Sequence, residues 1–252
     1  MKIAALVKQI PDQAAPQALD PDSFRLVRSG KMIIDDSDSY GVEASLQVAE
    51  KLAAEVSVVS MAPNQETAGV RTALAMGAAS AIVVSDHQLA GADALLTARV
   101  LAAAVVRTGA DLVVAATEST DGYTGTVPAQ VAALLGWPAL TFAKEMQVDG
   151  GTVRIKRQTE DGFEEVEAEL PAVVSVTAGS VVPRYPSFKG IMGAKNKPVE
   201  LLTLGDLGIA AEVGERVTGV RDAEARAAGE VFEDDGSAEE RIVAFLEGIK
   251  VL

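Results

Sequence analysis

Residues 111–130 read DLVVAATESTDGYTGTVPAQ, an apolar run followed by a small polar loop and the start of an Ala-rich helix. A continuous β-branched run such as DLVVAA (111–116) is typical of a strand that is buried on both faces of a parallel sheet. The loop after it, TESTDGYTGT (117–126), contains more glycine and hydroxyl side chains than a helix cap requires. We therefore predict an α/β fold with a candidate ligand site in this loop.

The same alternation of strand and helix extends over the first two-thirds of the chain. Further buried strands are predicted at KIAALV (2–7), EVSVVSMA (55–62) and AIVVSD (81–86). Helical patterns lie between them, at 39–54, 64–77 and 92–109. This order, with short connections, predicts a doubly wound, mainly parallel sheet of Rossmann-like type.

Local signals mark the helix ends and the edge of the sheet where a ligand would bind. Asn64 and Asp93 lie near predicted N-caps, and Gly77 and Gly109 lie where glycine ends a helix. Ligands of doubly wound sheets bind beyond the carboxyl ends of the strands. The connections that follow strands here are 8–16, 35–38, 61–66 and 117–126.

The pattern changes after about residue 138. Alternating polar and apolar residues are interrupted at DGG (149–151) and EDG (160–162), which predicts an antiparallel addition built from hairpins. The run AVVSV (172–176) is predicted to return to the main sheet. Residues 178–209 are either a solvated linker or, because they carry large apolar side chains, a docking surface. An extended arm (209–237) and a small amphipathic helix (237–252) complete the chain.

Composition and charge exclude several kinds of chemistry. The 252 residues contain no Cys, which excludes disulfides, thiolate metal sites, iron–sulfur ligation and a Cys nucleophile. The one His, His87, is interpreted as a surface residue of a turn, and no GxSxG turn or metal-ligand spacing is present. A formal charge of −14 disfavours binding to nucleic acid and to anionic membranes. We expect a cytoplasmic protein without membrane insertion, because no apolar stretch reaches the roughly 20 residues that span a bilayer.

The loop 117–126 is neither a Walker A sequence nor a GxGxxG fingerprint. Its two glycines nevertheless allow backbone N–H groups to approach a ligand closely, and Thr124 and Thr126 supply hydroxyls. A helix that begins near residue 125 would add free N–H groups with a partial positive charge, which suits a phosphate. A cap loop without any ligand is the alternative, and the Asp121 carboxylate favours it unless that carboxylate points away.

Phrases along the chain resemble the beta subunit of electron transfer flavoproteins, over residues 2 to about 207. They are KIAALVKQIPD (2–12), IIDDSDSYGVEAS (33–45), RTALAMGAASAIVV (71–84), ESTDGYTGTVPAQVAALLGWP (118–138), LPAVVSV (170–176) and PRYPSFKGIMGAKNKPV (183–199). The resemblance implies a Rossmann-like domain of the adenine nucleotide alpha hydrolase-like kind. It also implies a heterodimer whose redox FAD lies mainly on the alpha subunit, at the junction, and an AMP with a structural role in the beta subunit. In electron-bifurcating members a second FAD takes the AMP pocket.

The resemblance implies which positions of this chain line the AMP pocket. They are Leu6, Asp35, Asp36, Ser37, Asp38, Met61, Val113, Ala115, Thr117, Ser119, Asp121, Gly122, Tyr123, Thr124, Gly125 and Thr126. Thr124 and Gly125 match the family's phosphate-binding pair. Residues 35–37, Tyr123 and Thr126 depart from the usual side chains, so backbone contacts are expected to matter most there.

The resemblance also implies two contacts with partner proteins. A recognition loop (184–193) would dock acyl-CoA dehydrogenases and related flavoenzymes, with Phe188 as the apolar anchor. The residues assigned to it are Arg184, Tyr185, Pro186, Ser187, Phe188, Ile191 and Met192. Lys195 and Lys197 are expected to flank the loop as solvated charges that steer an acidic partner. Glu164 would pair with the flavin domain of alpha, although an ordinary surface role beside Glu165 is the alternative.

The resemblance implies a non-catalytic electron carrier subunit. Residues 1–207 would bind the nucleotide and 208–252 would form an arm on the alpha subunit. Electrons would pass from the dehydrogenases of fatty acid β-oxidation through FAD to a membrane quinone oxidoreductase. One alternative is a bifurcating subunit with its own FAD, and another is a stand-alone nucleotide-binding stress or signalling protein on the same fold.

Overall fold

A computed structural model describes residues 1–221, 223 and 229–251. The chain divides into two compact units, Met1–Thr218 and Gly219–Leu252. The predicted division at residue 207/208, into a nucleotide domain and an arm on the alpha subunit, stays a prediction. In the described residues, no helix has both the length and the apolar character needed to cross a membrane.

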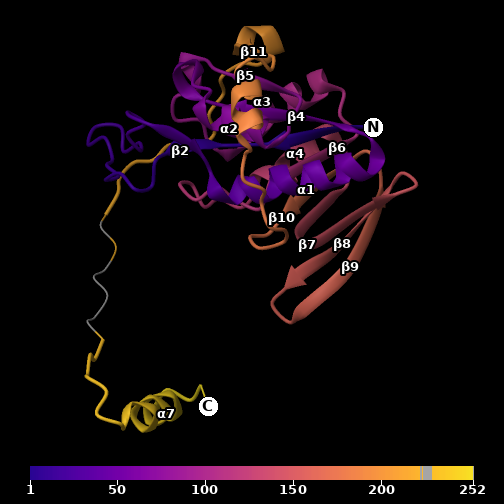
Figure 1. Cartoon of the computed structure of the whole chain (residues 1–252). Helices are drawn as coiled ribbons and strands as arrows, with labels where there is room; N and C mark the ends of the chain where they lie inside the picture. Colours follow the sequence, from indigo (N-terminus) through magenta and orange to yellow (C-terminus); the bar gives the residue numbers. More distant parts are fainter. Residues whose placement is uncertain (222, 224–228, 252) are drawn as a thin grey trace. The chain divides into compact units, whose positions relative to one another are not determined.

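The first unit is built on a nine-stranded sheet with the order β11-β5-β4-β1-β6-β10-β7-β8-β9 (Figure 1). The strands are β1 (Lys2–Leu6), β4 (Glu55–Met61), β5 (Ser80–Val84), β6 (Leu112–Ala116), β7 (Ala139–Asp149), β8 (Thr152–Thr159), β9 (Gly162–Glu169), β10 (Ala172–Val176) and β11 (Val199–Leu202). Neighbours pair in parallel from β11 to β7, and β7–β8 and β8–β9 are antiparallel. A second, two-stranded antiparallel sheet joins β2 (Gln9–Pro11) and β3 (Met32–Ile34). The predicted α/β class with an antiparallel addition is confirmed.

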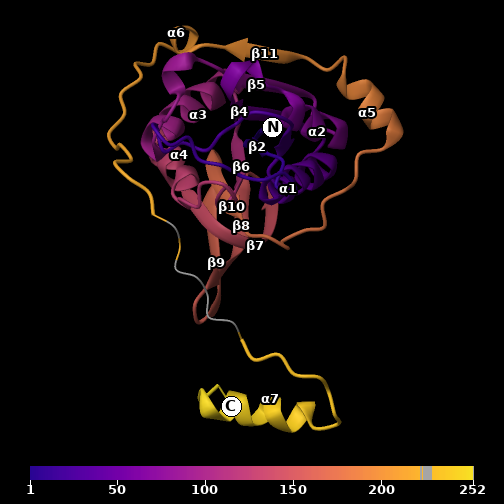
Figure 2. The ribbon, with the colours of Figure 1, turned by 90° about the vertical axis from the view of Figure 1, so that its left-hand side faces the viewer.

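Helices cover both faces of the parallel sheet (Figures 1 and 2). The covering helices are α1 (Asp36–Leu52), α2 (Ala68–Met76), α3 (Ala94–Thr108) and α4 (Val127–Leu135). Helix α5 (Phe188–Ala194) packs on α2, and α6 (Leu204–Leu207) lies against α3 and β11. The single turns η1 (Pro63–Gln65) and η2 (His87–Leu89) contact each other. Along β1, Ile3 and Ala5 belong to the core on the α1–α2 face, whereas Ala4 and Leu6 belong to the core on the α3–α4 face. Burial on both faces is the reason that the strands appear in the sequence as continuous apolar runs.

The predicted cap at Asp93 and the two predicted C-terminal glycines are confirmed, whereas two predicted helix starts are wrong. The Asp93 carboxylate caps α3, and Gly77 and Gly109 end α2 and α3. Helix α1 begins at Asp36, because the buried Asp35 carboxylate accepts a hydrogen bond from the Ser37 N–H; residues 35–38 are therefore a helix start rather than a loop. Asn64 lies in a short turn with a φ of 52°, and α2 begins only at Ala68.

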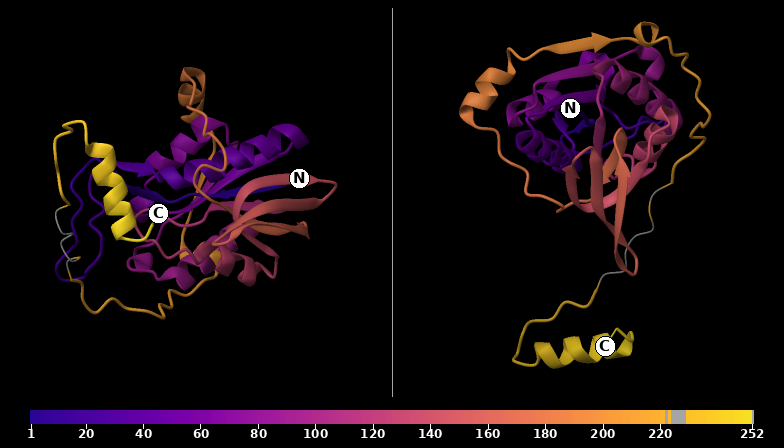
Figure 3. Two further views of the ribbon diagram at one scale, coloured as in Figure 1. Left: turned by 90° about the horizontal axis from the view of Figure 1, so that it is seen from below. Right: turned by 90° about the vertical axis from the view of Figure 1, so that its right-hand side faces the viewer.

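The hairpins predicted at residues 149–151 and 160–162 join β7, β8 and β9, and β10 returns to the sheet between β6 and β7. Figure 3 shows the β8–β9 hairpin from two further sides, projecting past the helices. The linker interpretation of residues 178–209 is wrong in part, because this stretch forms α5 and the edge strand β11. β11 is short and pairs only with β5, so little periodicity marks it in the sequence.

The beginning of the predicted arm packs on the first unit. Ile209 and Ala211 contact the core on the α3–α4 face, and the N–H groups of Gly214 and Glu215 donate to the Asp93 carboxylate at 2.6 and 3.0 Å. The second unit contains the helix α7 (Ala238–Gly248), which exposes Ile242 and Phe245. The predicted terminal amphipathic helix is therefore present.

Candidate functional site

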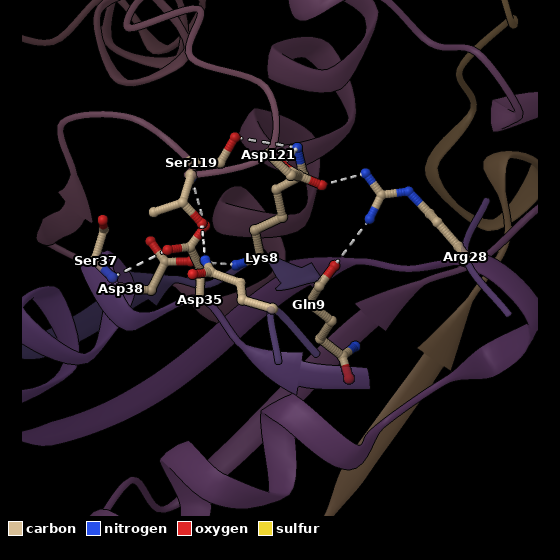
Figure 4. A network of polar contacts seen from close by, with 10 residues as sticks. Lys8, Gln9, Arg28, Asp35, Ser37, Asp38, Ser119 and Asp121 are labelled. Carbon is tan, nitrogen blue, oxygen red and sulfur yellow. Dashed lines mark hydrogen bonds and ion pairs between the residues drawn. The ribbon is translucent and has the colours of Figure 1, made fainter. Parts of the chain in front are cut away.

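The candidate site forms at the carboxyl ends of β1 and β6, which are neighbours in the sheet. Lys8 follows β1 closely, the loop 117–126 follows β6, and the first turn of α1 lies beside both (Figure 4). Because parallel strands end at the same edge, residues more than 100 positions apart in sequence meet here.

Two cations hold the Asp121 carboxylate. Lys8 Nζ lies 2.6 Å from Asp121 Oδ1, and the Arg28 guanidinium donates to Oδ2 and to the Gln9 carbonyl oxygen (Figure 4). The Asp121 side chain is only 8% exposed. Burial acts to raise the pKa of Asp121, but Lys8 and Arg28 outweigh it, so this pKa lies below its ordinary value. The carboxylate is therefore neutralised within the protein and does not oppose an anion at the loop.

Two further carboxyl groups tie the start of α1 to the site, one to the loop and the other to the segment after β1. Asp35 Oδ1 accepts from the Ser37 N–H at 3.0 Å, and Asp35 Oδ2 accepts from the Thr120 N–H at 2.7 Å. Asp38 accepts from the Lys8 N–H (Figure 4). Burial raises the pKa of Asp38 well above its usual range, and the neighbouring Asp35 raises it further. Asp35 thus serves as a structural cap, and the environment of Asp38 favours a neutral carboxyl.

The loop itself leaves N–H groups free for a ligand. Helix α4 begins at Val127 rather than near residue 125, and the Thr126 side chain makes no capping bond. Within the described part of the chain, the N–H groups of Thr124, Gly125 and Thr126 donate to no backbone carbonyl. Gly125 has a φ of +64°, a conformation that favours glycine. The loop therefore offers consecutive N–H donors ahead of a helix, as phosphate sites do.

Gly122 makes room for the Lys8 side chain. A Cβ atom at this position would lie 2.9 Å from Ser119 Oγ and 3.3 Å from Lys8 Nζ. Lys8 Nζ itself donates to Ser119 Oγ at 3.1 Å. The glycine thus serves the packing of a cation against the loop.

A second candidate surface is formed by α5 and the residues before it. Ser187 caps α5 by accepting from the Gly190 N–H at 3.0 Å. Apolar side chains stand out from this segment, with Tyr185 96% and Phe188 80% exposed, and Ile191 and Met192 half-exposed. A contiguous set of exposed apolar groups is typical of a protein interaction site.

The comparisons with known proteins identify the family. Residues 23–207 match the family described as electron transfer flavoprotein domain. The chain is 38% identical to the electron transfer flavoprotein subunit beta of Mycobacterium bovis and to that of Mycobacterium leprae, over 99% of both chains in each case. The chain belongs to the electron transfer flavoprotein beta-subunit family. The subunit beta of Clostridium acetobutylicum is 36% identical over 83% of this chain and 81% of its own length. The caffeyl-CoA reductase-Etf complex subunit CarD of Acetobacterium woodii is 34% identical over 84% and 82%.

Membership in this family makes the chain a component of an electron transfer flavoprotein, a flavin-associated electron carrier. The name beta subunit implies an alpha subunit as its partner. The stand-alone stress or signalling alternative loses support for the same reason.

The predicted nucleotide residues of this electron transfer flavoprotein subunit fall into two groups. One group consists of Thr117, Ser119 and residues 121–126 of the loop described above, together with residues 35–38 at the start of α1 beside it. Leu6, Met61, Val113 and Ala115 lie within strands, and they pack in the core on the α3–α4 face. Among these apolar residues, Leu6 and Met61 end their strands and so lie at the ligand edge.

Sequence reasoning missed Lys8 and Arg28. Lys8 carries a signal, because a cation close behind a first buried strand lies at the ligand edge of the sheet. Arg28 carries none, since it reaches Asp121 across 93 residues of sequence. Its position beside the site depends on how the connection between β2 and β3 folds back.

The docking and flavin-domain residues also need one correction. Lys197 is not a solvated charge, because its Nζ donates to the carbonyl oxygens of Leu74 at 2.8 Å and Ala78 at 2.6 Å. Lys195 is exposed, as expected. Arg184 forms ion pairs within the chain, with Glu43 and Glu50. The assigned Glu164 is exposed on β9, 3.6 Å from Arg157.

Replacing Asp38 by Asn is expected to stabilise this beta subunit increasingly as the pH rises. The folded-state pKa of Asp38 lies above its unfolded value of about 4. The wild type therefore loses stability as the pH rises from the unfolded pKa to the folded pKa. The Asn amide buries no charge and keeps an oxygen for the Lys8 N–H. The difference in unfolding free energy between Asp38→Asn and the wild type should therefore grow by up to about 1.4 kcal/mol per pH unit between the unfolded and folded pKa values of Asp38.

Urea unfolding of the heterodimer between pH 5 and 8 measures this difference. Asp36→Asn is the matched control, at an exposed position in the same helical turn. A gain from Asp38→Asn that is no larger than the gain from the control would contradict the burial of a neutral Asp38.

Proposed function

We propose that this chain holds a structural AMP at the carboxyl ends of β1 and β6. The proposal rests above all on one observation: the N–H groups of Thr124 to Thr126, which have no carbonyl partner among the described residues, lie in the same loop that Lys8 contacts. Backbone N–H groups and an ammonium group are the donors that phosphate binding requires. The charges of Asp35 and Asp121 would oppose an anion, but both carboxylates have partners within the chain. Asp35 accepts hydrogen bonds from Ser37 and Thr120. Asp121 forms ion pairs with Lys8 and Arg28.

The beta subunit would perform no bond chemistry of its own. The FAD of the heterodimer, mainly on the alpha subunit, supplies the redox chemistry. The residues of this chain would hold the AMP, pack against the alpha subunit and present α5 to a partner. Electrons would come from acyl-CoA dehydrogenases of fatty acid β-oxidation and leave to a membrane quinone oxidoreductase, in the cytoplasm.

The α5 surface would dock the dehydrogenase through Phe188. A single exposed aromatic side chain suits a partner that binds, exchanges electrons and leaves, because one anchor supplies only part of a stable interface. Tyr185, Pro186, Ile191 and Met192 would surround the anchor. Glu164 would contact the flavin domain of alpha from the β8–β9 hairpin.

A bifurcating role is the second candidate, because the similar CarD protein of Acetobacterium woodii is named as part of a caffeyl-CoA reductase complex. In that case a second FAD would occupy the AMP site. The nucleotides released on denaturing the purified heterodimer distinguish the two functions. One FAD and one AMP per heterodimer is the expected result, and two FAD without AMP would establish the alternative.

Replacing Lys8 by Met is expected to weaken AMP binding by at least about tenfold, because a charge-assisted hydrogen bond to phosphate is lost. The FAD content of the heterodimer should stay unchanged. Chromatography of the released nucleotides measures both. Lys31→Met is the control, since Lys31 is exposed and pairs with Asp12 alone among the described acidic residues. Equal AMP content in both variants would contradict a phosphate contact at Lys8.

A further inference from the structure

The proposed docking helix α5 depends on its packing against α2. A seven-residue helix is too short to be stable alone in water, so tertiary contacts must maintain it. α5 lies directly against α2 (Figure 2), with Ala194 buried in the core. At Gly190 a Cβ atom would lie 2.4 Å from the carbonyl oxygen of Ala75, a distance that no side chain allows. Glycine at this position therefore permits the close approach of the two backbones.

Two cationic side chains bind α2 and the segment 188–197 to each other, one from each side. Arg71, on α2, donates through Nη1 to the carbonyl oxygens of Ala194 at 2.7 Å and Lys197 at 2.9 Å. Lys197, beyond α5, donates through Nζ to the carbonyl oxygens of Leu74 and Ala78. Each cation thus satisfies carbonyl groups at the end of the other segment's helix, where the helix dipole favours positive charge.

These hydrogen bonds involve only backbone carbonyl oxygens of the two segments, so they leave the apolar side chains of α5 exposed. Burial lowers the pKa of Lys197, as expected for an ammonium group withdrawn from water. Phe188, Ile191 and Met192, in contrast, remain exposed on the same short helix. The helix is thus held from one side while its other side is open to a partner.

We propose that Gly190, Arg71 and Lys197 are positioning residues that fix α5 in its docking conformation before the dehydrogenase arrives. The inference rests on the proposed docking role of α5. A segment that is already ordered loses less conformational entropy on binding, so the partner binds more tightly for the same contacts. The partner is a flavoprotein dehydrogenase with an apolar pocket that receives Phe188.

The test compares two glycines of the same helix. Gly190→Ala places a Cβ against Ala75, whereas Gly193→Ala meets nothing within 4 Å. In the complete heterodimer, Gly190→Ala should accelerate amide hydrogen exchange over residues 187–196. It should also raise the KM for a reduced acyl-CoA dehydrogenase about three- to tenfold, with kcat and the contents of FAD and AMP unchanged. Gly193→Ala is the control for exchange and should not accelerate it, because alanine favours a helix more than glycine does.

Lys197→Met serves as a second variant, because it removes the bonds to Leu74 and Ala78 without adding bulk. It should reproduce the rise in KM even if Gly190→Ala does not yield folded protein. Unchanged KM in a folded variant, or a raised KM without faster exchange in α5, would overturn the positioning role. Phe188→Ala separates the two proposals: if it also leaves KM unchanged, the docking role fails, and if it alone raises KM, only the positioning role fails.

Discussion

Phe188→Ala is expected to raise the KM for the reduced dehydrogenase by about ten- to a hundredfold. Burial of a Phe side chain contributes roughly 1.5–3 kcal/mol, and every 1.4 kcal/mol is a factor of ten in affinity. Phe188 is 80% exposed in this chain, so removal of its ring should leave the fold of the chain intact. Steady-state reduction of the heterodimer by an acyl-CoA dehydrogenase, at varied heterodimer concentration, measures the effect.

The control for this prediction is Val106→Ala. Val106 is an exposed apolar residue of α3, on the opposite face of the sheet from α1 and α2. It should leave the KM unchanged, because nothing assigns it to docking. An unchanged KM in Phe188→Ala, with FAD and AMP at wild-type content, would refute the anchor role.

Arg184→Met is expected to lower the free energy of unfolding by about 3 kcal/mol. Glu43 is only 4% exposed, and Arg184 donates to it from the backbone N–H, from Nε at 2.7 Å and from Nη2 at 3.0 Å. Without the guanidinium, Glu43 would be a buried carboxylate that keeps only the bonds from Gln47 and from the backbone N–H of residue 184. Removal of one partner of a buried ion pair costs about 3–5 kcal/mol. The shift of the urea midpoint of the heterodimer measures it.

The stability loss in Arg184→Met should depend on pH. In the wild type, burial acts to raise the pKa of Glu43, but the bonds from Arg184 outweigh it and this pKa is lowered. The stabilisation is therefore present above the unfolded pKa and is lost as the pH falls through the folded pKa. In the variant, burial favours the protonated form of Glu43. The loss of unfolding free energy in Arg184→Met, relative to the wild type, should then be smaller at pH 5 than at pH 8.

Two variants provide controls for this prediction. Arg154→Met removes an ion pair with Glu167 in which both side chains are 58% exposed, and it should change the stability by less than about 1 kcal/mol. The double variant Glu43→Gln, Arg184→Met should recover part of the lost stability, because it buries no charge. Equal losses in Arg184→Met and Arg154→Met would contradict the role of Glu43.

Most of the fold of this electron transfer flavoprotein subunit was predictable, because its signals are local. The run at 112–116 and its counterparts predicted strands buried on both faces, and Asp93 and Gly109 marked the two ends of α3. The edge strand β11 was missed, since its four residues follow a polar stretch and pair with β5, more than 100 residues earlier.

The candidate site was predictable to a smaller extent. Glycine and threonine residues marked the loop 117–126, and the resemblance to the family assigned it to AMP. The start of α4 was misplaced by two residues. The partners of Asp121 were not predictable, because Lys8 and Arg28 reach it from distant parts of the sequence.

The sequence by itself determined where most of the strands and helices lie and which loop after a strand is rich in glycine and threonine. Those properties depend on side-chain periodicity and on glycine, which act within a few residues. Only the tertiary structure decided that Asp121 is neutralised by Lys8 and Arg28, that Asp35 is a cap, and that Lys197 binds the end of α2 instead of steering a partner. Charge pairing and burial act through space, and the distances that govern them arise only when the sheet is assembled.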